Sequence, residues 1–397
     1  MNNNEPGIPI LSRVSYSALT LGAAGVTLSV LAWYGSKSLF MQSWYFAVIF
    51  WTSLTLGCFG IMLLHHTLRG IWGIPLLRFV EAGAKMLPLV ALMWFPVLLS
   101  GMDSVFPWAR HDALENPVMR HRYIWMNEGA VTLRWALYFA LWIFLASKLN
   151  RWSVLEDETG NHALAQKRTN LAAPSLVLYV ITVSLAMTDW VMSLYPEWES
   201  TIFGLLFVVG QGLGGLAFSI LSVSLLSGIR PWLNVLNPRL YKDFGNMMLT
   251  FVILWAYMSF SQYLLIWSAN LPSEISFYVV RSHGGWWWMG NALIFFQFFV
   301  PFMLLLSSKT KRTPLLLAFT AGWILVMRVV DIYWIVMPAF RPMSFAFHWQ
   351  DLAAFCAIGG LWCSGVFYMF MHSRFIPTHD ARIDIAMGMR SEVTGDV

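Results

Sequence analysis

Long apolar segments recur along this chain and set the length of each predicted element. Ten of them come close to the length of about 20 residues that an α-helix needs to cross a bilayer. Only closed helices or barrels satisfy their own backbone hydrogen bonds in lipid, so the pattern predicts an all-α, polytopic membrane protein with ten transmembrane helices in one integral membrane domain, residues 1–397. The predicted helices are Tyr16 to Tyr34, Trp44 to Leu64, Met86 to Met102, Trp125 to Ser147, Ala172 to Leu194, Ile202 to Leu226, Met247 to Ser268, Trp287 to Leu306, Leu315 to Met337 and Leu352 to Met371.

Composition agrees with the pattern. Hydrophobic residues make up 58% of the chain and charged residues 11%, whereas soluble domains carry about 25% charged residues. The net charge of +5 does not imply a nucleic acid partner, because in a membrane protein it reflects loop charge. The three cysteines, Cys58, Cys356 and Cys363, show neither CxxC nor CxxCH spacing. The sequence therefore signals no disulfide framework, no covalently attached haem and no iron-sulfur cluster.

Basic residues predict the orientation. The two ends and the loops after the second, fourth, sixth and eighth helices carry 17 Lys and Arg residues, against six in the alternate loops. Because basic loops stay in the cytoplasm, we expect a multi-pass membrane protein with both termini in the cytoplasm. We expect polar cytoplasmic segments at residues 1–15 and 372–397, and no signal peptide. The stretch Lys148 to Thr169 is expected to be a solvated surface or docking loop.

Asp189 is the exceptional residue, because it lies within a predicted span. A carboxylate near the bilayer centre costs about 2.5 to 3.5 kcal/mol, so it must face protein, water or a cation. One interpretation is a structural polar contact between helices. The other is a functional site for protons or quinone.

Further polar groups lie at a comparable depth in the predicted outer half. Arg328 and Asp331 are three residues apart, so they share a helix face, and an intrahelical ion pair is the simplest interpretation. The other members of this group are Gln262, Arg134 and Glu128. If the helices converge, Arg134 or Arg328 offers each acid a cation.

The inner half offers a different set of groups. His65 and His66 end the second helix and are candidates for the inner entry of a proton path. Gln211, Gln297 and several hydroxyls lie between the two halves, where they could organise a water chain or make ordinary hydrogen bonds between helices. Adjacent histidines at one membrane edge are a poor arrangement for the opposed axial ligands of a haem.

Three strings on the predicted outer side resemble a known family. They are TDWVMSLYPEWESTIFG at Thr188 to Gly204, WAYMSFSQYLLIWSANLPSEISFY at Trp255 to Tyr278, and RSHGGWW from Arg281. They resemble the ActF membrane protein of bacterial alternative complex III, a quinol:electron-acceptor oxidoreductase whose acceptor is cytochrome c or a comparable periplasmic carrier. ActF belongs with the NrfD-like or polysulfide-reductase-C-like membrane proteins. The resemblance implies two four-helix bundles, helices 2–5 and 6–9, flanked by helices 1 and 10.

The resemblance also implies a location, the bacterial cytoplasmic membrane, together with partners and cofactors. The partners are a sister NrfD-like membrane protein of the same complex, iron-sulfur and multihaem cytochrome subunits, and lipids, with a terminal oxidase as a further candidate. The resemblance implies that haem and iron-sulfur clusters are bound by those subunits and not by this chain. The expected role of this chain is to support assembly of the complex and proton translocation. Two alternatives stay open: a protein that binds quinone directly, and a secondary transporter, for which Pro88 and Pro96 could break the third helix.

Overall fold

The computed structural model describes residues 8–230, 232–377, 380 and 382–383, and these residues form helices and their connections, with no strand. The first half of the chain contains α1 (Ile8–Gly35), α2 (Lys37–Leu68), η1 (Ile71–Gly73), α3 (Leu77–Ala84), α4 (Leu87–Met93), α5 (Phe95–Ser100), α6 (Met102–Val105), η2 (Pro107–Ala109), η3 (Ala113–Glu115), α7 (Pro117–Arg122), α8 (Glu128–Thr159), α9 (Ala163–Trp190) and η4 (Met192–Leu194). The second half contains α10 (Phe203–Leu225), α11 (Trp232–Val235), α12 (Pro238–Ala269), α13 (Pro272–Arg281), α14 (Gly284–Ala292), η5 (Leu293–Phe299), α15 (Val300–Leu306), α16 (Ser308–Arg312), α17 (Pro314–Val336), η6 (Met337–Ala339) and α18 (Trp349–Met371).

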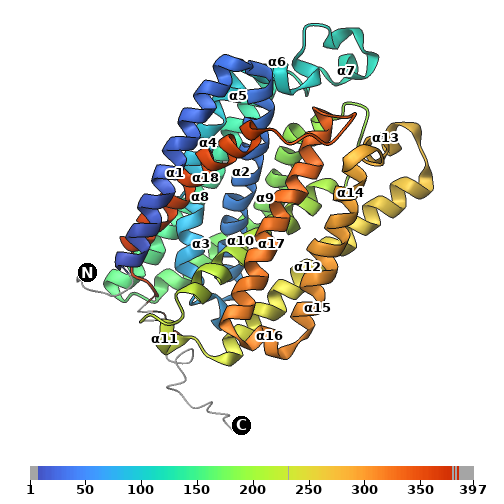
Figure 1. Cartoon of the computed structure of the whole chain (residues 1–397). Helices are drawn as coiled ribbons and strands as arrows, with labels where there is room; N and C mark the ends of the chain where they lie inside the picture. Colours follow the sequence, from blue (N-terminus) through green and yellow to red (C-terminus); the bar gives the residue numbers. More distant parts are fainter. Residues whose placement is uncertain (1–7, 231, 378–379, 381, 384–397) are drawn as a thin grey trace.

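Ten segments in the described part of the chain are long and apolar enough to cross a membrane, which confirms the predicted multi-pass fold class. The helices run side by side (Figure 1). We call the end at which α1 begins, which also carries α11 and α16, the basic end, and the other the opposite end. The third span is interrupted next to Pro88 and Pro96, where α3, α4 and α5 meet. Proline explains these breaks, since it donates no hydrogen bond to the preceding turn.

The expected loop at residues 148–169 is wrong. α8 continues to Thr159 and α9 begins at Ala163, so this stretch is a helical hairpin with a very short turn. Gly160 ends α8 in the left-handed region at φ 66°, and its N–H bonds to the Glu156 carbonyl. Glycine adopts this conformation without steric cost, which explains a sharp stop in a polar sequence.

The two ends of the chain also differ from the expectation. α1 begins at Ile8, within the segment expected to be a polar tail, because the apolar side chains before Tyr16 extend the helix toward the basic end. After α18, Phe375 is buried against Trp232 and Phe370, so the chain packs on the basic end beyond Met371. The remaining parts of the expected tails, residues 1–7 and 384–397, lie outside the described residues.

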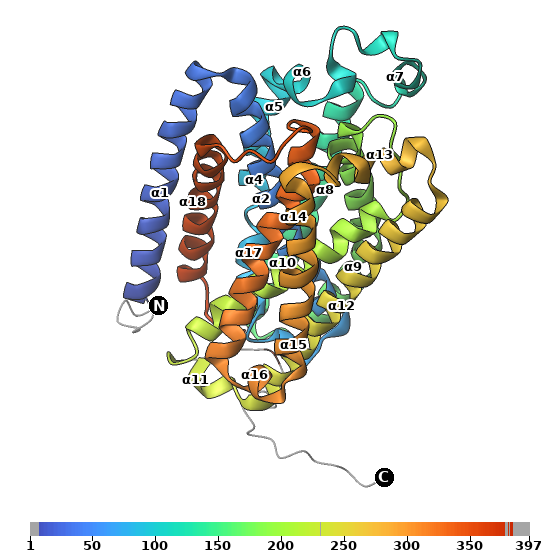
Figure 2. The ribbon, with the colours of Figure 1, turned by 45° about the vertical axis from the view of Figure 1, so that its right-hand side comes forward.

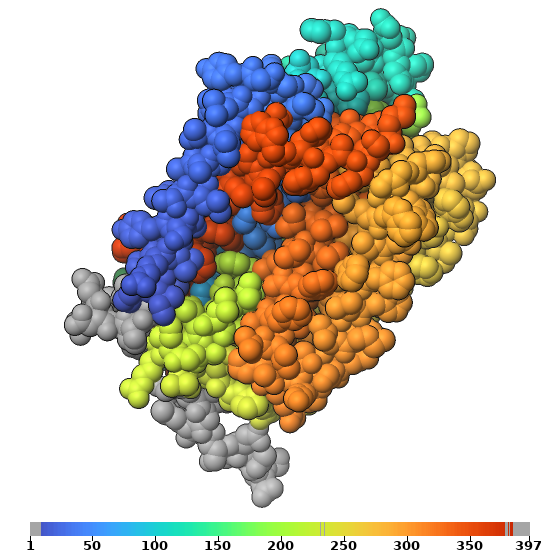
Figure 3. All heavy atoms as spheres, viewed as in Figure 1, coloured from blue at the N-terminus to red at the C-terminus, as the bar shows by residue number. Residues whose placement is uncertain are grey.

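Packing places α2 and α10 at the centre. In the apolar 18-residue stretch of α2, 94% of the residues are buried, against 22% in the corresponding stretch of α1. α2 contacts α3, α9, α10 and α18, while α10 contacts α2, α9, α12 and α17. The view in Figure 2 separates α1 and α18 from α17 and α14. In Figure 3, α1 forms a ridge along the edge of the molecule.

Glycine makes the central contact possible. A Cβ on Gly57 of α2 would lie 2.0 Å from the Gln211 carbonyl oxygen of α10, and one on Gly215 would lie 2.4 Å from the Gly57 carbonyl carbon. Small residues let helix backbones approach closely in lipid, where packing rather than water drives association. The contact brings Gln211 to the middle of the molecule.

Candidate functional site

Asp189 lies on α9 and is fully buried. Arg134 of α8 donates to it twice, from Nε to Oδ2 at 2.7 Å and from Nη2 to Oδ1 at 3.0 Å. The Trp125 indole donates to Oδ1 at 2.9 Å, and the Tyr138 hydroxyl donates to Oδ2 at 3.2 Å. The Arg134 guanidinium also stacks over the Trp125 ring, 4.1 Å from its centroid. Four hydrogen bonds therefore fix this carboxylate in place.

This arrangement suits a structural charge pair. A bidentate arginine and carboxylate form a strong, directional contact, and here it joins α8 to α9 and to the loop before α8. Asp189 lines neither of the two pockets described below. The geometry thus favours the structural interpretation of Asp189, and its role in proton transfer stays a prediction.

A second buried acid, Asp331, lies on α17. Its Oδ2 accepts from Arg328 of the same helix, from the Trp255 indole at 3.2 Å and from the Gln297 amide at 3.3 Å. The intrahelical ion pair expected from the three-residue spacing is present. Because Trp255 comes from α12 and Gln297 from η5, three membrane spans meet at this one oxygen.

A local irregularity brings Gln297 to this site. Residues Leu293–Phe299 form a π-helix inside an otherwise regular span, and Pro301 follows directly. Pro301 has no N–H to donate to the carbonyl of Gln297, four residues earlier, so a regular α-helix would leave that carbonyl without its partner. Single π-turns inside α-helices occur frequently at functional sites. The proline therefore offers a local cause for the turn that directs Gln297 at Asp331.

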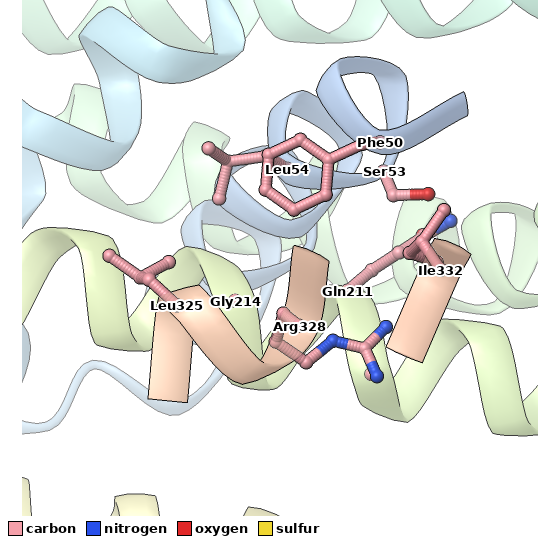
Figure 4. Close-up of a pocket in the computed structure, with 9 residues that line it drawn as sticks. Phe50, Ser53, Leu54, Gln211, Gly214, Leu325, Arg328 and Ile332 are labelled. Carbon is pink, nitrogen blue, oxygen red and sulfur yellow. The ribbon is translucent and has the colours of Figure 1, made fainter. Parts of the chain in front are cut away.

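Arg328 also borders a small cavity of about 10 Å³ (Figure 4). The Ser53 hydroxyl and the Gln211 Nε2 have no hydrogen-bond partner among the described residues, and both side chains line this cavity. The remaining Gln211 oxygen accepts from the Tyr179 hydroxyl at 3.0 Å. The wall is mostly apolar, but Ser53, Gln211 and Arg328 reach it, and a space of this size has room for about one water molecule. The other lining residues are Phe50, Leu54, Gly210, Gly214, Leu325 and Ile332.

The polar groups of the predicted outer half do not converge on one cluster but form two separate sites. Within the described residues, no hydrogen bond or ion pair joins Asp189 to Asp331. Gln262 is buried on α12, and its Oε1 has no partner in the described structure. Glu128 is exposed at the start of α8, and no ion pair reaches it from the described residues. Of Gln262, Glu128 and Arg134, only Arg134 is seen to bond to one of the two acids in the described structure.

His65 and His66 are buried at the basic end of α2. The Nδ1 of His65 and the Nε2 of His66 have no partner among the described residues. Gly73 packs so closely against the His65 ring that a Cβ there would lie within 2 Å of Nδ1. The two imidazoles are adjacent, with ring centroids 5.6 Å apart, but the protein encloses them.

A charged network next to these histidines was not predicted. Arg78 of α3 donates to Glu81 at 2.5 Å, to the Ser153 hydroxyl at 3.0 Å and to Asp157. A second buried pair in the same region joins Arg168 of α9 to Glu156 of α8. The only sequence pattern that could have predicted this buried network is the mixture of acidic and basic residues between Asn150 and Arg168, and the same mixture is typical of a solvated loop.

Two buried groups at the opposite end were also missed. Asp351 accepts from Arg341 at 2.8 and 3.0 Å, from Ser43 at 2.6 Å and from Tyr333 at 3.0 Å. The other group is Arg281, which donates to the carbonyls of Phe277 and Ile335, both at 2.6 Å, and of Trp334 at 3.1 Å.

The Arg281 guanidinium stacks over the Phe277 ring, 3.4 Å from its centroid. Burial lowers the pKa of Arg281, and the hydroxyl of Tyr195 opposes that shift. The guanidinium stays charged, since arginine keeps its proton in proteins. The main-chain carbonyls and the aromatic ring therefore take the place of a counter-ion.

The described residues contain no group of three or more His, Cys, Asp and Glu side chains placed to hold a metal ion. Cys58 is buried, and Cys356 and Cys363 are partly buried; all three are free thiols.

No protein-family model matches this sequence, and no curated protein is similar to it. The fold and the site define a class only: a multi-pass helical membrane protein with charge pairs buried among its spans.

Proposed function

We propose that this chain is a membrane subunit of a respiratory quinol:electron-acceptor oxidoreductase, similar to ActF of bacterial alternative complex III, and that it carries protons. The observation that carries the proposal is the position of Arg328. It pairs with Asp331 and also borders a small, mostly apolar cavity, where the Ser53 hydroxyl and the Gln211 Nε2 have no partner among the described residues. An ionisable pair beside space for water is what proton transfer inside a membrane requires.

The helix packing supports the family assignment. Helices 2–5 of the predicted arrangement correspond to α2, α3–α5, α8 and α9, and helices 6–9 to α10, α12, α14–α15 and α17. Contacts within each set, such as α2 with α9 and α10 with α17, are those that two four-helix bundles require, while extensive contacts of α10 with α2 and α9 join the two sets. In such an arrangement Asp189 and Asp331 each lie on the last helix of their own bundle. α1 and α18 pack against the first set, where α18 contacts α2, α3 and α4.

In the proposed path, protons enter at the basic end near His65 and His66 and leave through the Arg328 and Asp331 pair. Between them lie Tyr179, Gln211 and Ser53. By helix rise, Ser53 and His65 are separated by about 18 Å, so ordered waters must complete the connection. The basic end faces the cytoplasm of the bacterial cell, and lipid surrounds the spans.

Electron transfer belongs to the partner subunits in this proposal. Quinol oxidation takes place at the sister NrfD-like membrane protein, and iron-sulfur and multihaem cytochrome subunits carry the electrons. This chain holds no redox cofactor. A conformational change at the interface between the two membrane proteins couples the two processes.

The test of proton transfer is an Asp331→Asn variant of the intact complex in proteoliposomes. Asn keeps the size of the side chain and its hydrogen bonding to Trp255 and Gln297, but it cannot titrate and it leaves Arg328 without its counter-ion. We expect quinol oxidation to continue with fewer protons released per electron. Asp103→Asn, at an exposed acid of the opposite end, is the control and leaves the ratio unchanged. An unchanged ratio for Asp331→Asn in well-coupled vesicles removes this residue from the path.

The test of identity is purification from native membranes in mild detergent. The proposal expects co-elution with multihaem cytochrome and iron-sulfur proteins, seen by absorption and electron paramagnetic resonance spectra. A homo-oligomer that elutes alone and transports a solute would overturn it.

A further inference from the structure

A larger pocket, of about 530 Å³, opens toward the basic end. It lies between α8 and the junction of α3 with α4. Most of its lining comes from positions of α8 spaced three or four residues apart, which form one helix face. The lining residues are Lys85, Ser147, Asn150, Arg151, Val154, Leu155 and Glu158.

Asn150 is the unusual member of this pocket. It is 4% exposed, yet neither its Nδ2 nor its Oδ1 has a hydrogen-bond partner in the described structure. Buried side-chain amides are nearly always paired, so an amide with both groups unpaired beside a pocket is a candidate to bind water or a ligand. That ligand must offer a hydrogen-bond acceptor to Nδ2.

Charge indicates what kind of acceptor. Lys85 and Arg151 supply two cations, Ser147 adds a hydroxyl, and Glu158 is the one acid in the lining. Amide, hydroxyl and cationic donors together match the oxygens of a phosphate group. The carboxylate of Glu158 disfavours a free, doubly charged phosphate more than the singly charged phosphodiester of a lipid.

The position of the pocket fits a lipid. It begins at Ser147, where the apolar run of α8 gives way to charged residues. α8 has 32 residues and is therefore about 48 Å long, well beyond the hydrocarbon thickness of about 30 Å. One turn deeper, Phe144 is 57% exposed and prolongs the same face with an apolar surface for an acyl chain.

We propose that this pocket binds the phosphate group of a membrane phospholipid. Lys85 and Arg151 hold the charge, Asn150 and Ser147 donate hydrogen bonds, and the acyl chains lie along α8 beside Phe144. Basic pockets between membrane helices at the cytoplasmic side hold lipid headgroups elsewhere. This site does not depend on the proton path or on the identity of the partner subunits.

The test is native mass spectrometry of the purified, delipidated protein titrated with phosphatidylglycerol. Wild type is expected to bind one tightly held lipid. Removing two charges near a membrane surface should weaken this binding on the order of 30-fold in the double variant Lys85→Met with Arg151→Met. A matched double variant, Lys309→Met with Arg312→Met, removes two exposed charges from α16 at the same end and retains the lipid.

Two further measurements make the outcome decisive. The Asn150→Leu variant keeps both cations and a similar side-chain volume, and it should still weaken lipid binding several-fold. If the double variant does not fold, the Asn150→Leu variant tests the proposal in its place. Excess inorganic phosphate should not displace the lipid. Equal lipid affinity in wild type and the pocket variants, or displacement by inorganic phosphate, contradicts the proposal.

Discussion

Gly210 of α10 lies directly against the guanidinium of Arg328: a Cβ at Gly210 would be 2.4 Å from Nη2. Alanine at this position must therefore move the arginine away from Asp331. We predict that Gly210→Ala lowers stability by about 1–3 kcal/mol, as overpacking of a buried contact does, and lowers proton release per electron. The measurements are the apparent melting temperature in detergent and the proton yield in proteoliposomes.

The same helix provides the control. Gly214 lies one turn further along α10 and borders the same cavity, but a Cβ there would meet only Leu54 at 3.6 Å, an ordinary contact. Gly214→Ala should behave like wild type in both measurements. If both variants lose stability equally, loss of helix flexibility rather than displacement of Arg328 is the cause.

Close packing of α2 on α10 leads to a second prediction. At Gly57 an added Cβ would meet the main chain at Gln211, which cannot rotate away as a side chain can. Gly57→Ala should cost about 3 kcal/mol, toward the upper end of overpacking effects, and reduce the yield of folded protein. Gly322→Ala in α17 is the control, since its nearest neighbour would be Leu221 at 3.9 Å. A normal melting temperature for Gly57→Ala would show that the two helices can separate without loss.

The Asp189 site yields a third prediction, which separates its two interpretations. Asp189→Asn leaves Arg134 without its counter-ion, and breaking such a pair costs about 3–5 kcal/mol. Replacing both residues with Leu and Met should restore most of the stability, since an apolar pair removes the unpaired charge. If that stable double variant releases fewer protons per electron than wild type, Asp189 belongs to the proton path after all.

Asp380 gives a pH-dependent prediction outside the spans. Burial alone would raise its pKa, but hydrogen bonds and charge from Arg382 outweigh burial and lower the pKa below the ordinary value of 3.8. Arg382 in turn bonds to the Arg69 carbonyl at the end of α2. A lowered pKa means that the charged form stabilises the fold: the contribution is complete above 3.8 and disappears as the pH falls through the folded value.

Asp380→Asn should therefore loosen residues 373–377 at pH 7, as measured by hydrogen exchange against wild type at the same pH. The difference between the two proteins should shrink below about pH 4, where wild type loses the same charge. Asp112→Asn, at an exposed acid of the opposite end, serves as control. A difference that stays constant down to low pH would assign the effect to packing instead.

The spans could be predicted because lipid imposes a length and an apolar composition on each helix. Their ends could not. α8 runs on to Thr159 because partners on α3 and α9, such as Arg78 and Arg168, neutralise its buried acids. Those partners are distant in sequence, so the same charges fit a solvated loop equally well.

The site was predictable in the same partial way. The Arg328 and Asp331 pair follows from helix periodicity, whereas no pattern in the sequence indicated that Trp125 bonds to Asp189. Gln297 offered one unused signal: a proline four residues later, which disturbs the backbone at the glutamine. Tertiary packing determines which helices meet at each acid, and the periodicity of the sequence carries no information about that packing.

The pairing of α1 with α18 determines how late in synthesis the first helix can find its packing partner. Gly22 and Gly360 bring the two helices into backbone contact, and Ser15 bonds to Ser364, 349 positions away. At the usual rate of synthesis of about 5–20 residues per second, the ribosome needs roughly 20 to 70 seconds to reach that partner. During this time α1 must wait in the lipid with its glycine face open. A chain released before α18 leaves that face available to a chaperone or to a wrong partner.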